Sequence, residues 1–203
     1  MRHHVRMPDT LRVPVLPAGD FRLRPWRMED LPLVREASTD PYIPQLTSVP
    51  ADYSEQAGRE FVQRQWARAE AGVGYPFVIA DARDDRPLGV VSLRMKDAAD
   101  GRANVGYWLA PSARGRGAAL AAVRTLSVWA IDRLGLERLE LTVEPWNTAS
   151  ARTAERAGYR AEGLMRSWQR IGGKRCDMTM YSLLPSDLKD DADADADTEA
   201  AAG

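Results

Sequence analysis

The sequence predicts an α/β domain with a mixed, mostly antiparallel sheet, a central parallel strand pair and flanking helices. An apolar run at 105–109 passes through a glycine-rich loop into a helical stripe and then into a second apolar run at 139–143. A strand–helix–strand unit of this kind makes a parallel pair with a right-handed crossover. On either side of this unit, β-rich runs joined by short polar or glycine turns predict antiparallel hairpins.

The N-terminal part is predicted to supply one strand and two helices. Residues 21–24 alternate in polarity, which predicts a strand. A helix is expected over 30–38 with Asp30 as its N-cap. The stretch 40–54 contains three prolines and predicts a surface loop, and residues 54–70 follow as an amphipathic helix.

The remaining predicted elements alternate between strands and helices. The strands are expected at 75–81, 88–96, 105–109, 139–143, 159–169 and 176–184. One helix is expected at 120–134 and ends at Gly135, and another at 149–157 is capped by Asn147 or Thr148.

Length and composition indicate one domain in a reducing compartment. The 203 residues are 44% hydrophobic, enough for one sizeable core, and the single cysteine excludes a disulfide framework and a cysteine zinc site. We expect a loose leader over 1–19, the folded domain over 20–188 and a disordered acidic tail over 189–203, where alternating Asp and Ala cannot bury apolar area. No apolar stretch approaches the roughly 20 residues of a membrane span. We therefore expect a cytoplasmic monomer or homodimer that binds no metal and no membrane.

The net charge of −1 hides an asymmetry, because six of the 29 acidic residues lie after residue 189. Residues 1–189 carry an excess of five basic groups. This excess is too small to indicate nucleic acid, and it fits a small anionic ligand.

The loop Arg114–Ala119 has the features of an anion site. A helix begins after it, and the first turn of a helix has unpaired N–H groups and a partial positive charge. Gly115 and Gly117 allow close approach of a phosphate to the main chain, and Arg114 and Arg116 add two positive charges. A Walker-type loop is excluded because Ala118 follows Gly117 where Lys is required. A dinucleotide fingerprint is disfavoured by the leucine at its sixth position.

Three motifs in order account for more residues. The loop Arg114–Ala119 matches the signature Arg/Gln-x-x-Gly-x-Gly/Ala, and it is preceded by Gly-Tyr-Trp-Leu at 106–109. Asn-Thr-Ala-Ser at 147–150 and Ala-Gly-Tyr-Arg-Ala-Glu-Gly at 157–163 follow. Through these motifs the chain, from about residue 21 to 188, resembles the GNAT N-acetyltransferases, in particular the ribosomal-protein-alanine N-acetyltransferase subgroup.

The resemblance implies that acetyl-CoA is the cosubstrate and that the parallel strands splay to admit its thioester. The loop and the following helix then hold the pyrophosphate, and the preceding strand pairs with the pantetheine amides. A backbone N–H near Leu109 is expected to polarise the thioester carbonyl. The residues expected to bind acetyl-CoA are Tyr107, Trp108, Leu109, Arg114, Gly115, Arg116, Gly117, Ala118, Ala119 and Asn147.

Acetyl transfer also needs a proton donor for the thiolate and help with the amine proton. The resemblance places Ser150 near the thiolate, and the alternative is that Ser150 and Asn147 only cap a helix. The two positions where the family has a glutamate hold Asn104 and Gln169, so the general base is open. Glu144, at a strand end, is the remaining nearby carboxylate and is alternatively a solvated charge.

The function implied is transfer of an acetyl group from acetyl-CoA to a primary amine by direct attack in a ternary complex. The acceptor is either a protein N-terminus or a small-molecule amine, bound by the loop 40–54 and the closing hairpin near 171–174. The alternative is a non-catalytic acyl-CoA-binding regulatory module, motivated by the missing carboxylates.

Overall fold

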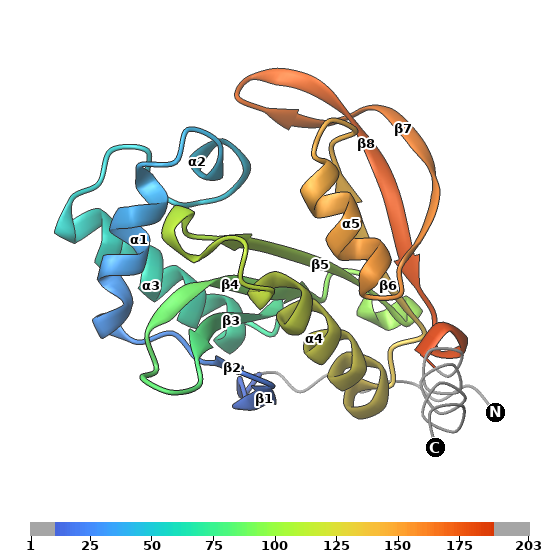
Figure 1. The fold of residues 1–203 in the computed structure, drawn as a ribbon, viewed down its shortest axis with the longest axis horizontal. Helices are drawn as coiled ribbons and strands as arrows, with labels where there is room; N and C mark the ends of the chain where they lie inside the picture. Colours follow the sequence, from blue (N-terminus) through green and yellow to red (C-terminus); the bar gives the residue numbers. More distant parts are fainter. Residues whose placement is uncertain (1–10, 189–203) are drawn as a thin grey trace.

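The computed structural model describes residues 11–188, so the expected tail and the first part of the expected leader lie outside the described residues. An eight-stranded sheet with the order β1-β2-β3-β4-β5-β6-β8-β7 forms the centre of the molecule (Figure 1). Every neighbouring pair is antiparallel except β5 and β6, which are parallel. The predicted fold class is therefore confirmed.

The elements follow one another as predicted, with a few additions. The strands are β1 Leu16–Ala18, β2 Phe21–Arg24, β3 Gly74–Asp81, β4 Pro87–Arg94, β5 Arg102–Leu109, β6 Arg138–Val143, β7 Arg160–Ile171 and β8 Lys174–Leu183. The α-helices are α1 Leu31–Ser38, α2 Ile43–Leu46, α3 Glu55–Glu70, α4 Ala118–Leu134 and α5 Thr148–Arg156. Single 3-10 turns occur at Met28–Asp30, Ala98–Asp100 and Pro111–Ala113.

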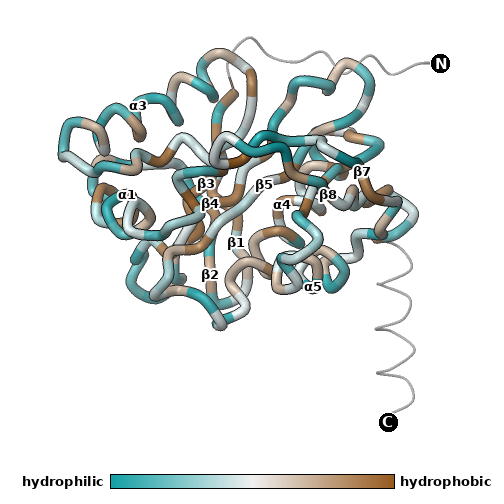
Figure 2. Tube along the Cα trace, turned by 90° about the horizontal axis from the view of Figure 1, so that it is seen from above, coloured by the Kyte–Doolittle hydropathy of each residue, from teal (hydrophilic) through white to brown (hydrophobic). Residues whose placement is uncertain are grey.

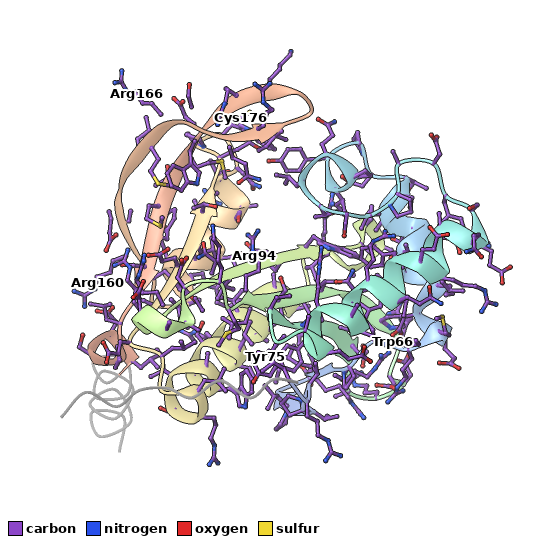
Figure 3. All side chains as sticks on the ribbon, turned by 180° about the vertical axis from the view of Figure 1, so that it is seen from behind. Trp66, Tyr75, Arg94, Arg160, Arg166 and Cys176 are labelled. Atoms are coloured by element: carbon purple, nitrogen blue, oxygen red, sulfur yellow. The ribbon has the colours of Figure 1, made fainter. Side chains whose placement is uncertain are left out.

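The helices cover both faces of the sheet. Figure 1 shows α4 and α5 on one face, whereas α3 lies on the other face, seen in front in Figure 3. The strands at the centre of the molecule are hydrophobic and the outer segments are largely hydrophilic (Figure 2). Phe77 of β3, Leu93 of β4 and Leu126 of α4 are fully buried between these layers. Within residues 11–188, no helix is long and apolar enough to cross a membrane.

Part of the expected leader is ordered. Residues 16–18 form the edge strand β1, which pairs with β2 through a turn at Gly19 (φ +64°). Further back, the N–H of buried Leu11 donates to the carbonyl of Ala69, at 2.8 Å. A strand of three residues is too short to show a polarity pattern, which explains why the sequence did not predict it.

Asp30 does not cap α1 as predicted. Its buried carboxylate instead accepts two hydrogen bonds from the Arg24 guanidinium, at 2.8 and 2.9 Å, and one from the N–H of Arg27. A carboxylate that is nearly inaccessible to water needs such partners, and the ion pair with a buried arginine takes precedence over capping. The expected loop 40–54 also contains the short helix α2, whose first N–H groups are bound by Asp40.

Candidate active site

The parallel strands β5 and β6 are paired over a short stretch only. Their register joins Arg102 to Arg138, Ala103 to Leu139 and Asn104 to Glu140. Beyond these pairs the strands diverge, and the expected splay is confirmed. A cleft of about 1150 Å³ includes the gap, and its walls come from both strands, α5, the glycine loop, α2 and the closing hairpin.

The splay leaves main-chain N–H groups of β5 facing the cleft. The N–H of Ala110 donates to the carbonyl of Leu88 at 2.9 Å, so the even-numbered residues of β5 point their polar groups toward β4. In an antiparallel ladder these directions alternate, and the N–H groups of Tyr107 and Leu109 therefore point toward β6. Since β6 has diverged by then, both donors are open to a ligand. Trp108 pairs with Val90 of β4 and also lines the cleft.

The glycine loop presents free space at the start of α4. Gly115 and Gly117 have φ values of +76° and +78°, a backbone region that favours glycine, and no atom lies within 4 Å of the place of a Cβ on either residue. Gly117 is also the N-cap of α4 and supplies no side chain to cap it. The N–H groups of Ala118 and Ala119 are thus left for an external anion.

Both loop arginines form ion pairs with buried carboxylates. Arg114 Nη2 lies 2.6 Å from Asp40 Oδ2, and Arg116 Nη2 lies 2.9 Å from Asp81 Oδ2. Hydrogen bonds from the N–H of Arg83 and from Arg116 lower the pKa of Asp81, which keeps it ionised. The arginines therefore tether the loop to the rest of the fold, and the sequence analysis missed their partners. No local pattern could have found carboxylates 74 and 35 residues away.

Tyr107 and Ser150 form a hydroxyl pair at the cleft. The Tyr107 phenol oxygen lies 2.8 Å from Ser150 Oγ, and both residues line the cleft. Burial raises the pKa of the Tyr107 phenol, although hydrogen bonds to Ser150 and Thr153 act in the opposite direction. The phenol is thus protonated at neutral pH. Asn147 caps α5, because its Oδ1 accepts from the main-chain N–H of Ser150 at 3.1 Å, and the Ser150 hydroxyl takes no part in that cap.

Glu144 is a buried carboxylate with one free oxygen. Glu144 is 7% exposed and lines the cleft. Its Oε2 has no hydrogen-bond partner among the described residues. Burial raises the pKa of the neighbouring Cys176 thiol, and Glu144 raises it further. Gln169 lines the cleft as well, whereas Asn104 stays in the paired part of β5 and does not. The alternative of a solvated charge for Glu144 does not agree with this burial.

The two segments expected to bind the acceptor meet at the cleft. The Gln45 side chain of α2 packs on Gly172 in the turn of the β7–β8 hairpin, and the two segments lie close together in Figure 1. The ring of Tyr42 contacts the ring of Trp146 edge to face, with centroids 5.1 Å apart. Aromatic side chains from the α1–α2 connection and from the end of β6 therefore meet beside the opening. Residues 11–188 contain no cluster of three potential metal ligands.

Comparisons with known proteins agree with this geometry. A family model described as an acetyltransferase (GNAT) domain matches residues 20–160. The probable N-acetyltransferase YjcK of Bacillus subtilis (strain 168) is 33% identical over 149 residues, covering 72% of this chain and 82% of YjcK. The structure of RimJ from Mycobacterium smegmatis in complex with CoA-disulfide has a TM-score of 0.72 and 26% identity, covering 86% of this chain and 87% of RimJ. An acetyltransferase from Salmonella typhimurium that modifies the N-terminal serine of ribosomal protein L7/L12 has a similar fold, with a TM-score of 0.71 and 21% identity, covering 84% and 99% of the two chains.

Proposed function

Because the chain belongs to the GNAT acetyltransferase family and uses acetyl-CoA to acetylate amines, we propose a protein N-terminus as its acceptor. The amine attacks the thioester directly while both substrates occupy the cleft. The observation that supports direct attack is the splay of β5 and β6, because two open N–H donors, a hydroxyl pair and a buried carboxylate border one gap. The family assignment does not favour the alternative of a non-catalytic binding module.

The donor side of the cleft is built to bind a phosphate-bearing thioester. The N–H groups at the start of α4 and the open glycine loop bind the pyrophosphate of CoA. The main-chain N–H of Tyr107 donates to an amide of the pantetheine, which lies between β5 and β6 as an additional strand would. The N–H of Leu109 donates to the thioester carbonyl and stabilises the negative charge that develops on its oxygen.

The proton transfers are assigned to Glu144 and to the Tyr107–Ser150 hydroxyl pair. The carboxylate of Glu144, which lines the cleft, accepts the proton that the amine loses as its nitrogen bonds to the carbonyl carbon. As the carbon–sulfur bond breaks, the Ser150 hydroxyl donates its proton to the thiolate and regains one from the Tyr107 phenol. As the products leave, the Tyr107 phenolate takes up a proton from water and Glu144 releases one to water, which restores both groups. An α-amino group titrates near pH 8 and a lysine side chain near 10.4, so one carboxylate serves an N-terminal amine more easily.

The test measures thiol release from acetyl-CoA with a panel of peptides at pH 6 to 9. We expect release with peptides that have a free N-terminus, and none with the same peptides after N-terminal acetylation, even when they contain lysine. If the protein binds CoA and no amine releases thiol, the function is wrong. If free lysine side chains or small amines react and N-termini do not, the acceptor class is wrong.

A further inference from the structure

A group of cationic side chains lines the cleft away from the glycine loop. Arg68 comes from the last turn of α3, Arg94 ends β4, and Lys96 follows it. All three are exposed, and no carboxylate among residues 11–188 forms an ion pair with any of them. Within the described part of the chain, the hydrogen-bond partners of the Arg68 guanidinium are neutral, Gln65 Oε1 at 3.0 Å and Ser48 Oγ at 3.5 Å. This differs from the two loop arginines, each of which has its own buried carboxylate.

Arg68 and Arg94 are close enough to affect each other. Partial loss of hydration lowers the pKa of the Arg68 guanidinium, and the positive charges of Arg64 and Arg94 lower it further. Like charges held together without a counter-ion are unfavourable unless an anion binds between them. The group is thus a candidate anion site.

Arg94 lies directly at the mouth of the splay. Its Nη2 and Ser92 Oγ each lie 3.8 Å from the place of a Cβ on Gly106. Gly106 comes two residues after Asn104, the last residue of β5 that pairs with β6. In Figure 3 Arg94 lies on this face of the sheet, below the β7–β8 hairpin that carries Cys176. The guanidinium of Arg94 and Gly106, which has no side chain, therefore border the opening.

This face is not the face of the donor loop. Gly106 is opposite Ser92 on β4, and successive side chains of a strand point to opposite faces. Tyr107 points to the α5 face, where it contacts Ser150, so Arg94 and Gly106 belong to the α3 face. The phosphates of CoA are assigned to the start of α4 on the other face. An anion bound at Arg94 would therefore belong to the acceptor.

We propose that Arg94, together with Arg68 and Lys96, binds an acidic side chain at the second or third residue of the acceptor. This inference rests on the proposed function and names the sequence class of the acceptor. Arg94 and Gly106 border β5 where the gap begins, and Glu144 follows the end of β6 on the other side of the gap. An extended peptide whose amine lies at Glu144 and whose chain crosses the gap directs its second and third residues toward Arg94. The cleft thus selects N-termini that are followed by Asp or Glu.

The test uses hexapeptides that have the same first residue and differ only at positions two and three. These positions hold Glu-Glu, Gln-Gln or Lys-Lys. We expect kcat/KM to be about tenfold higher for the acidic than for the neutral peptide, and the preference to shrink as salt screens the charges. Arg94→Gln should abolish the preference, and Arg94→Lys should retain part of it. Arg166→Gln, which removes an exposed charge of β7 outside the cleft, is the matched control and should leave it unchanged.

Binding separates this inference from the function on which it rests. The N-acetylated forms of the three peptides are titrated into the protein saturated with CoA, and their dissociation constants give the charge preference without turnover. Turnover with no preference for acidic peptides, or a preference that persists in Arg94→Gln, overturns the anion site. A binding preference that Arg94→Gln abolishes, with no turnover of any peptide, upholds the site and overturns the proposed function. If the protein acetylates free glutamate and none of the peptides, the acceptor is not a peptide and the inference is overturned.

Discussion

Ser150→Ala removes one hydroxyl from the cleft and leaves the adjacent helix intact. The cap of α5 is a bond from the main-chain N–H of Ser150 to Asn147, which alanine retains. The Tyr107 phenol loses its partner at 2.8 Å and keeps Thr153. Because the phenol still has one partner, we expect a loss of unfolding free energy of about 1 kcal/mol, the usual value for one hydrogen bond.

The effect on turnover should be much larger than the effect on stability. If Ser150 protonates the departing thiolate, its loss removes general acid catalysis, which contributes about 10² to 10⁴ in rate. The affinity for CoA should stay the same, since no pyrophosphate or amide contact changes. Tyr107→Phe removes only the group that returns the proton, so its loss of kcat should be smaller. The double variant should resemble Ser150→Ala, because the two residues act in one chain.

Single-turnover kinetics and a CoA titration test this reasoning together. Thr153→Ala is the matched control, since it removes the other partner of the phenol and should leave kcat nearly unchanged. If Ser150→Ala keeps kcat within about twofold of the parent, a difference of less than 0.5 kcal/mol in the barrier, Ser150 is not the proton donor. A parallel fall in CoA affinity would assign Ser150 to binding instead.

Three further predictions concern the base, the loop and the sheet. Glu144→Gln should lower kcat about 10²-fold or more without changing CoA affinity; a kcat within about twofold of the parent would exclude Glu144 as the base. Gly117→Ala and Gly19→Ala each place alanine in the left-handed backbone region, with open space around the new methyl group. Both variants should therefore lose about 1 kcal/mol of unfolding free energy, measured by urea unfolding. Only Gly117→Ala should lower the affinity for CoA in a direct titration. Equal CoA affinities in the two variants would contradict the assignment of the loop. The Arg138 guanidinium chiefly lowers the pKa of Glu162 to about 2 from its usual 4.5. This contribution to stability is present above about pH 4.5 and is lost as the pH falls toward 2. Because the pair is partly exposed, we expect it to contribute about 1 kcal/mol to the free energy of unfolding. Between about pH 4.5 and 2, the urea midpoint should therefore fall less in Glu162→Gln than in the parent protein.

The central part of the fold could be predicted because its signals are local. The glycine loop, the strand before it and the helix after it are contiguous, and their order alone implies the parallel pair. The splay and acetyl-CoA came from the resemblance, since no pattern in residues 102–109 shows where pairing with β6 ends. The open N–H of Leu109 follows from the register, which only the structure supplies.

Features that depend on distant partners could not be predicted. Asp40 and Asp81 look like ordinary loop and strand-end residues, and their role appears only when the fold brings them to Arg114 and Arg116. The same holds for Glu144, whose burial depends on the walls of the cleft and not on its neighbours in the sequence.

Both outer edges of the open sheet are poor templates for another strand. At one edge, β1 has three residues, and Pro17 at its centre has no N–H to donate. At the other edge, the register of β7 against β8 shifts twice, and Ser167, within the second shift, has a φ of +52°. Bulges and prolines of this kind prevent edge-to-edge association of sheets. An eight-stranded sheet that must stay open at its centre to admit two substrates is thus closed to further strands at its sides.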